Sequence, residues 1–127
     1  MNDLYVVEIE PEVRLWLANL SVRDYLNAED IVDRLVCFPT TLGEPYSRHL
    51  GGPVRELRFS LGHDRDAVRI PYWLGPGRRI ILLTVFRKSR QREEAEVDRA
   101  LRAQALCATE HGPAHEEFAR IIEEERH

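Results

Sequence analysis

Three successive segments predict a three-stranded sheet, and they constrain the fold more than any other feature of the chain. Residues 54–60 (VRELRFS) and 67–74 (AVRIPYWL) alternate between apolar and polar side chains, the period-2 pattern of strands with one buried face. Residues 79–86 (RIILLTVF) are apolar on both faces, as expected of a central strand. Gly75-Pro76-Gly77 is a strong turn signal before the last segment. Such a sheet must bury its apolar face against other elements.

The alternation also assigns side chains to the two faces of this sheet. The inward positions are Leu57, Phe59, Val68, Ile70, Tyr72 and Leu74. The outward positions are Glu56, Arg58, Arg69, Pro71 and Trp73. Arg58 and Arg69 would then share the open face of adjacent strands and form an anion site. Pro71 lacks a ladder donor and predicts a bulge, which would move Arg69 from that position.

The flanking segments complete an α+β pattern. Leu4–Ile9 predicts a strand, and Pro11 suits the first turn of a helix that follows it. A second helix is predicted to begin at Ser21, where Asp24 completes a pattern like a capping box. We expect this N-terminal strand and helical hairpin to pack on an antiparallel sheet, with helices on one face and a C-terminal helix after it.

The remaining segments set the boundaries of the predicted loop, the C-terminal helix and the domain. Residues 39–53 are rich in Pro, Gly, Ser and Thr and predict a loop. The C-terminal helix is predicted over residues 93–108, so one domain spans residues 1–108. His111-Gly112-Pro113 breaks this helix, and residues 109–127 are expected to form an extension with a short helix over 114–125.

The charge of the chain is segregated. Residues 48–92 hold 11 of the 18 Lys and Arg residues and 3 of the 22 Asp and Glu residues, a net charge of +8 in a chain of net charge −4. We expect this basic segment to form one face that binds polyanions. No leader peptide or apolar run of membrane length is present, so we expect a cytoplasmic protein without membrane contact.

Other chemistries lack a signature. The two cysteines, Cys37 and Cys107, form no CxxC pair or Cys/His cluster, so neither a disulfide framework nor a metal site is predicted. The sequence contains no GxxxxGK[ST], no GxGxxG after a strand and no HExxH. We therefore expect no cofactor.

Four motifs in order carry a resemblance to a known family: the helical hairpin, HLGGPVRELRF, VRIPY, and RRIILLTVFRKSRQ followed by an acidic helix. Together they resemble the RelE/ParE toxin superfamily, most closely its HigB-like branch that includes phage-derived relatives. The resemblance covers about residues 5–106. It implies a toxin of a type II toxin–antitoxin pair, a class whose members mostly cleave mRNA on the ribosome.

Cleavage of RNA without a metal requires activation of the 2′-OH, stabilisation of the phosphorane and protonation of the leaving oxygen. Arginine suits the second task because its fork matches phosphate oxygens and stays charged. The resemblance implies that Arg58, Arg69 and Lys88 are active-site residues, although each arginine could also be a solvated strand residue. The predicted RNA contacts are Arg55, Arg87, Arg90 and Trp73, of which Trp73 could instead touch a partner helix.

The general acid and base are less defined. Many nucleases of the family place Tyr or His at the start of the last helix, and residues 89–96 contain neither. Glu56 shares the open face with Arg58 and is a candidate base. His49 could supply a proton near neutral pH, whereas Tyr72 faces inward and is expected in the core.

The resemblance predicts a ribosome-dependent mRNA endoribonuclease that blocks translation. Its partners would be mRNA, the ribosome and a cognate antitoxin of the helix-turn-helix type. Two alternatives remain: a non-catalytic inhibitor of DNA gyrase, as in the ParE-like minority, and a catalytically dead RNA-binding relative.

Overall fold

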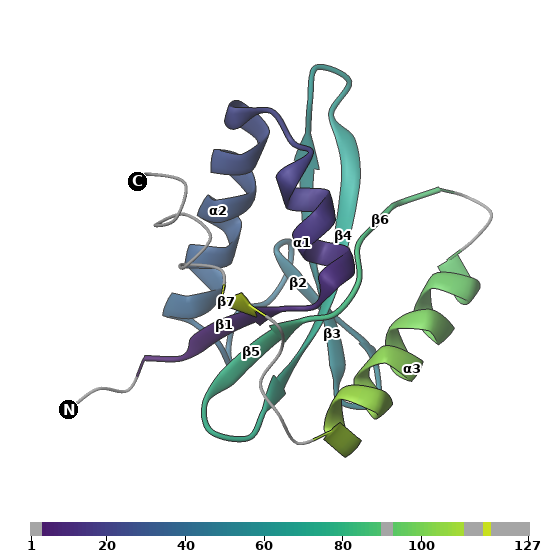
Figure 1. The fold of residues 1–127 in the computed structure, drawn as a ribbon. Helices are drawn as coiled ribbons and strands as arrows, with labels where there is room; N and C mark the ends of the chain where they lie inside the picture. Colours follow the sequence, from purple (N-terminus) through teal and green to yellow (C-terminus); the bar gives the residue numbers. More distant parts are fainter. Residues whose placement is uncertain (1–3, 90–92, 111–115, 118–127) are drawn as a thin grey trace.

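The computed structural model describes residues 4–89, 93–110 and 116–117 and confirms a mixed α+β fold (Figure 1). The elements in chain order are β1 (Val6–Ile9), α1 (Pro11–Ala18), α2 (Val22–Cys37), β2 (Ser47–Gly51), β3 (Val54–Leu61), β4 (Asp66–Gly75), β5 (Arg79–Leu82), β6 (Phe86–Arg87), α3 (Glu93–Glu110) and β7 (Glu116–Glu117). None of the helices it describes is long and apolar enough to cross a membrane.

The helical hairpin forms where the sequence predicts it. Pro11 occupies the first turn of α1, where its missing N–H costs no hydrogen bond. Ser21 is the N-cap of α2, and its hydroxyl accepts a hydrogen bond from the Asp24 N–H at 3.1 Å. The predicted starts of both helices are confirmed.

The sheet is mixed rather than wholly antiparallel. Its strand order is β2-β3-β4-β5-β1-β7, and β6 also pairs with β4. Strands β2 to β5 are antiparallel neighbours, whereas β1 runs parallel to β5, with Val6 opposite Arg79 and Ile9 opposite Leu82. The expectation of an antiparallel sheet was therefore wrong for β1. This N-terminal strand pairs with β5, which is distant in the sequence, and the two strands run in the same direction.

Two strand predictions needed correction. The expected loop over residues 39–53 contains β2, a strand whose polar sequence gives little β signal but which pairs along β3. The expected strand over residues 79–86 is divided into β5 and β6. Tyr72 is opposite Leu82 and Arg69 is opposite Phe86, so one extra residue lies on the β5–β6 side at the level of Pro71.

The predicted irregularity at Pro71 therefore lies on only one side of β4. On the β3 side of β4 the register has no shift. It begins with Arg55 opposite Tyr72 and ends with Leu61 opposite Asp66. Arg69 consequently keeps the position that alternation gives it.

Helices pack on both faces of the sheet, not on one face as expected. The first core lies under α1 and α2 and includes the predicted inward residues Leu57, Val68, Ile70 and Tyr72. The second core lies between the other face and α3, and its buried members are Val54, Ile81, Leu83, Ala100 and Cys107. The α3 helix thus covers part of the face that the sequence predicts to be open.

The C-terminal helix continues to Glu110, two residues beyond the predicted end at Ala108. In the segment expected to form a short helix over residues 114–125, the structure describes only Glu116–Glu117. These two residues form β7, which pairs antiparallel with Glu8 and Ile9 of β1. The rest of that expectation lies outside the described residues.

Candidate active site

A cluster of three charged residues, Glu56, Arg58 and Arg69, lies on the sheet face that α3 partly covers. Glu56 and Arg58 are two residues apart on β3 and therefore share this face. Arg69 is directly opposite Arg58 on β4. The sequence prediction that the two arginines share one face agrees with this register.

The Glu56 carboxylate lies close to both guanidiniums. Its Oε2 atom is 3.7 Å from Arg58 Nε and 3.8 Å from Arg69 Nε. These distances are ion-pair distances, too long for hydrogen bonds. Glu56 is 6% exposed and Arg69 is 7% exposed, so the charges interact with little screening by water.

Burial raises the pKa of the Glu56 carboxyl above its ordinary value of 4.5, although the Arg69 and Arg58 charges act in the opposite direction. Burial and the neighbouring Arg58 charge lower the pKa of Arg69, while Glu56 acts to raise it. A carboxylate with a raised pKa accepts a proton more readily than an exposed one. Arginine remains charged at neutral pH despite such a shift.

The cluster has an unused hydrogen-bond donor. Arg58 Nε is buried and makes no hydrogen bond with any residue that the structure describes. The facing arginines also repel each other, and one carboxylate neutralises only one of their two charges. A bound phosphate would supply both the missing acceptor and the second negative charge.

Two residues that the sequence analysis did not assign to the site surround this cluster. Arg48 is opposite Glu56 on β2, and Glu93 is the first residue of α3. Both residues influence the pKa of Glu56 and of Arg69 through their charges. Arg48 was missed because its strand was predicted to be a loop, and Glu93 because its position depends on where α3 docks.

The predicted basic residues after the sheet fall into three groups. Lys88 donates its backbone N–H to Ala67 O at 2.8 Å, which by alternation places Lys88 on the same face as Arg69. Arg87 is opposite Val68 on the other face, is 74% exposed, and pairs with Asp66 at 2.9 Å. Arg90 lies outside the described residues.

Arg55 and His49 are directed away from the cluster. Arg55 alternates with Glu56 on β3, and it donates hydrogen bonds to Ser47 Oγ at 2.9 Å and Leu42 O at 3.4 Å. His49 is opposite Arg55, and its Nε2 atom is 3.0 Å from Gly52 O. The structure thus does not bring these two predicted residues together with Glu56, Arg58 and Arg69, because neighbouring residues of a strand face opposite sides.

Trp73 and Tyr72 belong to the two cores. Trp73 is partly buried and packs in the second core with Ala100 and Cys107 of α3, so a helix of the same chain occupies the outward face of the indole. Tyr72 is fully buried, as expected, and its hydroxyl is 2.7 Å from Ser47 Oγ. Other parts of the chain thus cover Trp73 in part and Tyr72 completely.

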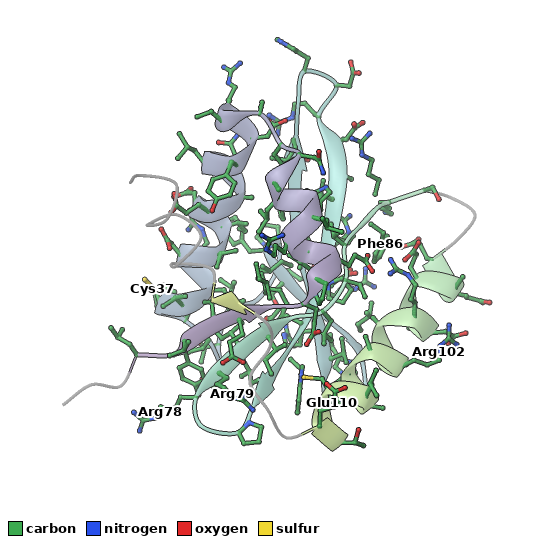
Figure 2. The ribbon with its side chains drawn as sticks, in the orientation of Figure 1. Cys37, Arg78, Arg79, Phe86, Arg102 and Glu110 are labelled. Carbon is green, nitrogen blue, oxygen red and sulfur yellow. The ribbon has the colours of Figure 1, made fainter. Side chains whose placement is uncertain are left out.

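The basic segment does not form a single basic face. Arg55 faces the helical hairpin, and Arg79 lies at the β4–β5 turn (Figure 2). Arg79 pairs with Glu8 at 3.2 Å. The cluster around Glu56 therefore contains fewer of the basic residues than the charge of residues 48–92 suggests. Within the described residues, no group of three His, Cys, Asp or Glu side chains is placed to hold a metal ion.

Ion pairs and hydrogen bonds from α1 fix the position of α3 beside the cluster. Arg99 of α3 pairs with Glu12 of α1 and with Glu96, and Glu12 also accepts the Val85 N–H at 3.0 Å. The hydrogen bond with Glu12 raises the pKa of Arg99 more than any other contact does. Glu12 thereby connects α1, the segment between β5 and β6, and α3.

The fold is that of the RelE toxin. A solved structure described as a double arginine mutant of the E. coli toxin RelE in the free state superimposes with a TM-score of 0.54. The match covers 78% of this chain and 96% of that chain at 12% sequence identity. The predicted resemblance to the RelE/ParE superfamily is confirmed at the level of the fold.

The family is defined by sequence. Residues 15–105 match the family described as phage derived protein Gp49-like (DUF891), and the chain belongs to this family. No curated protein matches the chain.

Proposed function

We propose that this protein is the toxin of a type II toxin–antitoxin pair and that it cleaves mRNA on the ribosome. The cluster of Glu56, Arg58 and Arg69 on a RelE-like sheet is the observation that carries the proposal. The Gp49-like family and the similarity to a protein described as a toxin support the same class.

The cluster suits the first two steps of RNA cleavage. Glu56 would accept the proton of the 2′-OH, and its raised pKa lies closer to neutral pH than that of an exposed glutamate. Arg58 and Arg69 would stabilise the charge that develops on the phosphorane. A single positioned donor of this kind contributes on the order of 10² to 10³ in rate.

Lys88 is the candidate for the third step. It follows β6 on the face of Arg69, and its ammonium could neutralise or protonate the 5′ leaving oxygen. The ribosome would then position the mRNA, because Trp73, the aromatic residue predicted to contact RNA, packs in the second core instead.

The proposed partners follow from this function. A cationic cluster that attacks mRNA must be blocked in the producing cell, so we propose a cognate antitoxin of the helix-turn-helix type. An acidic or amphipathic antitoxin segment over the cluster would associate rapidly and exclude RNA at the same site.

Controlled expression without a partner tests the proposal. We expect growth to stop, and primer extension on cellular mRNA should find new 5′ ends within translated messages only. Glu56→Gln should restore growth while the protein remains folded. Intact mRNA together with gyrase-dependent DNA breaks would instead indicate the gyrase inhibitor, and normal growth with soluble wild-type protein would exclude a toxin.

A further inference from the structure

Arg48 adds a third arginine to the sheet face of the candidate active site. It lies on β2, directly opposite Glu56 of β3, so the two side chains share one face. The strand order β2-β3-β4 then places Arg48, Arg58 and Arg69 on three neighbouring strands. Because β2 is the last strand at this end of the sheet, Arg48 lies where the cluster reaches the sheet edge.

Arg48 is exposed, and no carboxylate neutralises it. Residues of opposite charge at directly opposed positions of a sheet attract each other. The Glu56 carboxylate nevertheless approaches Arg58 and Arg69, at 3.7 and 3.8 Å. Arg48 forms no ion pair with any residue that the structure describes. Its guanidinium therefore remains a positive charge next to the cluster that an anion from solution can approach.

The first turn of α3 has the opposite charge. Its acidic residues are Glu93, Glu94 and Glu96. Both this turn and Arg48 lie within electrostatic reach of the cluster. Burial is the main cause of the raised pKa of Glu56, and the charge of Glu93 adds to the increase, whereas the charge of Arg48 opposes it. A polyanion bound at Arg58 and Arg69 would therefore be attracted toward β2 and repelled by the start of α3.

We propose that Arg48 binds an RNA phosphate next to the scissile one, so that the mRNA strand leaves the cluster across the β2 edge of the sheet. This inference rests on the proposed function, because it adds a contact to the same substrate. Neighbouring strands are about 4.8 Å apart and the rise per residue is about 3.4 Å, so the backbones of Arg48 and Arg58 are about 8 Å apart. Two long side chains at this separation can hold consecutive phosphates. Arg48 would thus position the RNA, while Glu56 and Arg58 act on the reacting atoms.

Ribosome-dependent cleavage of modified mRNAs tests this contact. Primer extension with the wild-type protein first locates the scissile phosphate. Two further mRNAs each carry one uncharged methylphosphonate, immediately 5′ or immediately 3′ of the scissile phosphate. A 2′-O-methyl group on the preceding nucleotide protects the modified linkage. The reference mRNA for each carries the same 2′-O-methyl group and an ordinary phosphate.

The expected result is a loss that depends on one phosphate. On the reference mRNA, Arg48→Ala should lower kcat/KM about tenfold and leave kcat near the wild-type value, because it removes a charge-assisted contact away from the reacting atoms. One of the two methylphosphonates should lower kcat/KM of the wild type by a similar factor and leave that of Arg48→Ala unchanged. Arg48→Lys keeps a positive charge, so it should retain most of the wild-type kcat/KM and respond to the same methylphosphonate.

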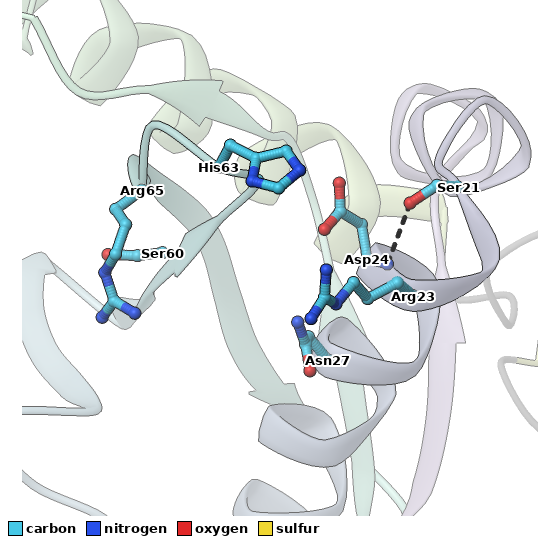
Figure 3. Close-up of a pocket in the computed structure, with 8 residues that line it drawn as sticks. Ser21, Arg23, Asp24, Asn27, Ser60, His63 and Arg65 are labelled. Atoms are coloured by element: carbon cyan, nitrogen blue, oxygen red, sulfur yellow. Dashed lines mark hydrogen bonds between the residues drawn. The ribbon is translucent and has the colours of Figure 1, made fainter.

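Arg23→Ala is the matched control. Arg23 is an exposed arginine of α2 and lines a pocket between this helix and the β3–β4 turn (Figure 3). Like Arg48, it forms no ion pair within the described part of the chain. Because α2 packs on the other face of the sheet, the variant changes the net charge without changing the cluster. It should keep the wild-type kcat/KM on every mRNA, and thermal melts should show that both alanine variants remain folded.

Three results would overturn the inference and leave the proposed function intact. Full activity of Arg48→Ala on the reference mRNA would show that Arg48 is idle. An equal loss in Arg23→Ala would reduce the effect to net charge. If each methylphosphonate changed the rates of Arg48→Ala and the wild type by the same factor, Arg48 would contact another phosphate, such as one of ribosomal RNA. A folded wild-type protein that cleaves no mRNA would contradict the proposed function, and this inference with it.

Discussion

Arg58 and Arg69 face each other across β3 and β4, and both guanidiniums approach the same oxygen of Glu56, at 3.7 and 3.8 Å. Like charges at directly opposed positions of a sheet are destabilising. One carboxylate offsets this repulsion only in part, and Arg58 Nε has no hydrogen-bond acceptor among the described residues. The free protein therefore holds two facing arginines whose positive charges Glu56 neutralises only in part, as the proposed anion site requires.

Arg58→Ala should separate activity from stability. The substitution removes a contact to the phosphorane, so the cleavage rate should fall on the order of 10² to 10³. It also removes both the repulsion by Arg69 and the attraction to Glu56. Because these effects oppose each other, the free energy of unfolding should change by about 1 kcal/mol or less. Ribosome-dependent cleavage assays and thermal melts on the same preparations measure the two quantities.

Arg58→Lys is the matched control, because it keeps the charge and loses the planar fork. An intermediate cleavage rate would show that the geometry of the guanidinium matters. Full activity in Arg58→Ala would show that this arginine is idle, and an early melt would show that it is structural.

The pH dependence of stability should reveal Glu56. Its ordinary pKa is 4.5, and folding raises that pKa because the carboxyl is buried. Between these two values the native protein keeps a proton that the unfolded chain has lost, so the free energy of unfolding falls as the pH rises through this window. In the Glu56→Gln variant, the amide that replaces the carboxyl does not titrate in this pH window. The variant should therefore gain stability relative to the wild type as the pH rises from 4.5 to the folded pKa.

Urea unfolding at a series of pH values would measure the difference in the free energy of unfolding between Glu56→Gln and the wild type. The contributions of all other carboxyl groups cancel in this difference, because both proteins contain them. A constant difference across the window would mean that the pKa of Glu56 is not raised. A difference that shrinks with pH would mean that the arginines lower it instead.

Period-2 alternation was sufficient to predict the central part of the site. Arg58 and Arg69 could be assigned to one face because their side-chain directions follow from strand position alone. The uninterrupted β3–β4 register then places them opposite each other. The start of α2 could be predicted equally well, since the cap of Ser21 depends on a residue only three positions away.

Features that depend on distant packing could not be predicted in this way. The polar strand that carries Arg48 forms because β3 offers it an edge. Trp73 is outward by alternation, but α3 docks over it, and no local pattern shows which sheet face a helix 20 or more residues later will cover. Arg55 was grouped with the site by charge, whereas its strand position directs it to the opposite face.

Tyr72→Phe should leave cleavage unchanged, which tests whether this tyrosine replaces the missing acid. The Tyr72 hydroxyl is buried and 2.7 Å from Ser47 Oγ, on the face away from Glu56. Loss of this hydrogen bond should lower the free energy of unfolding by about 1 kcal/mol. A variant that is stable but inactive would place Tyr72 in the chemistry and would contradict the division of the sheet into two faces.

Glu12→Ala should destabilise the protein more than its partly exposed position suggests. The carboxylate accepts the Val85 N–H at 3.0 Å and pairs with Arg99 of α3. An exposed ion pair alone contributes about 1 kcal/mol or less. The variant also leaves a backbone N–H without its acceptor, which costs about 1 to 3 kcal/mol. Thermal melts should therefore show a clearly larger loss for Glu12→Ala than for Glu94→Ala, which removes an exposed carboxylate from the same helix as Arg99.

Glu12→Gln keeps an acceptor for Val85 and should recover most of the loss. Equal melting of Glu12→Ala and Glu94→Ala would mean that α3 keeps its place beside the cluster through the second core alone.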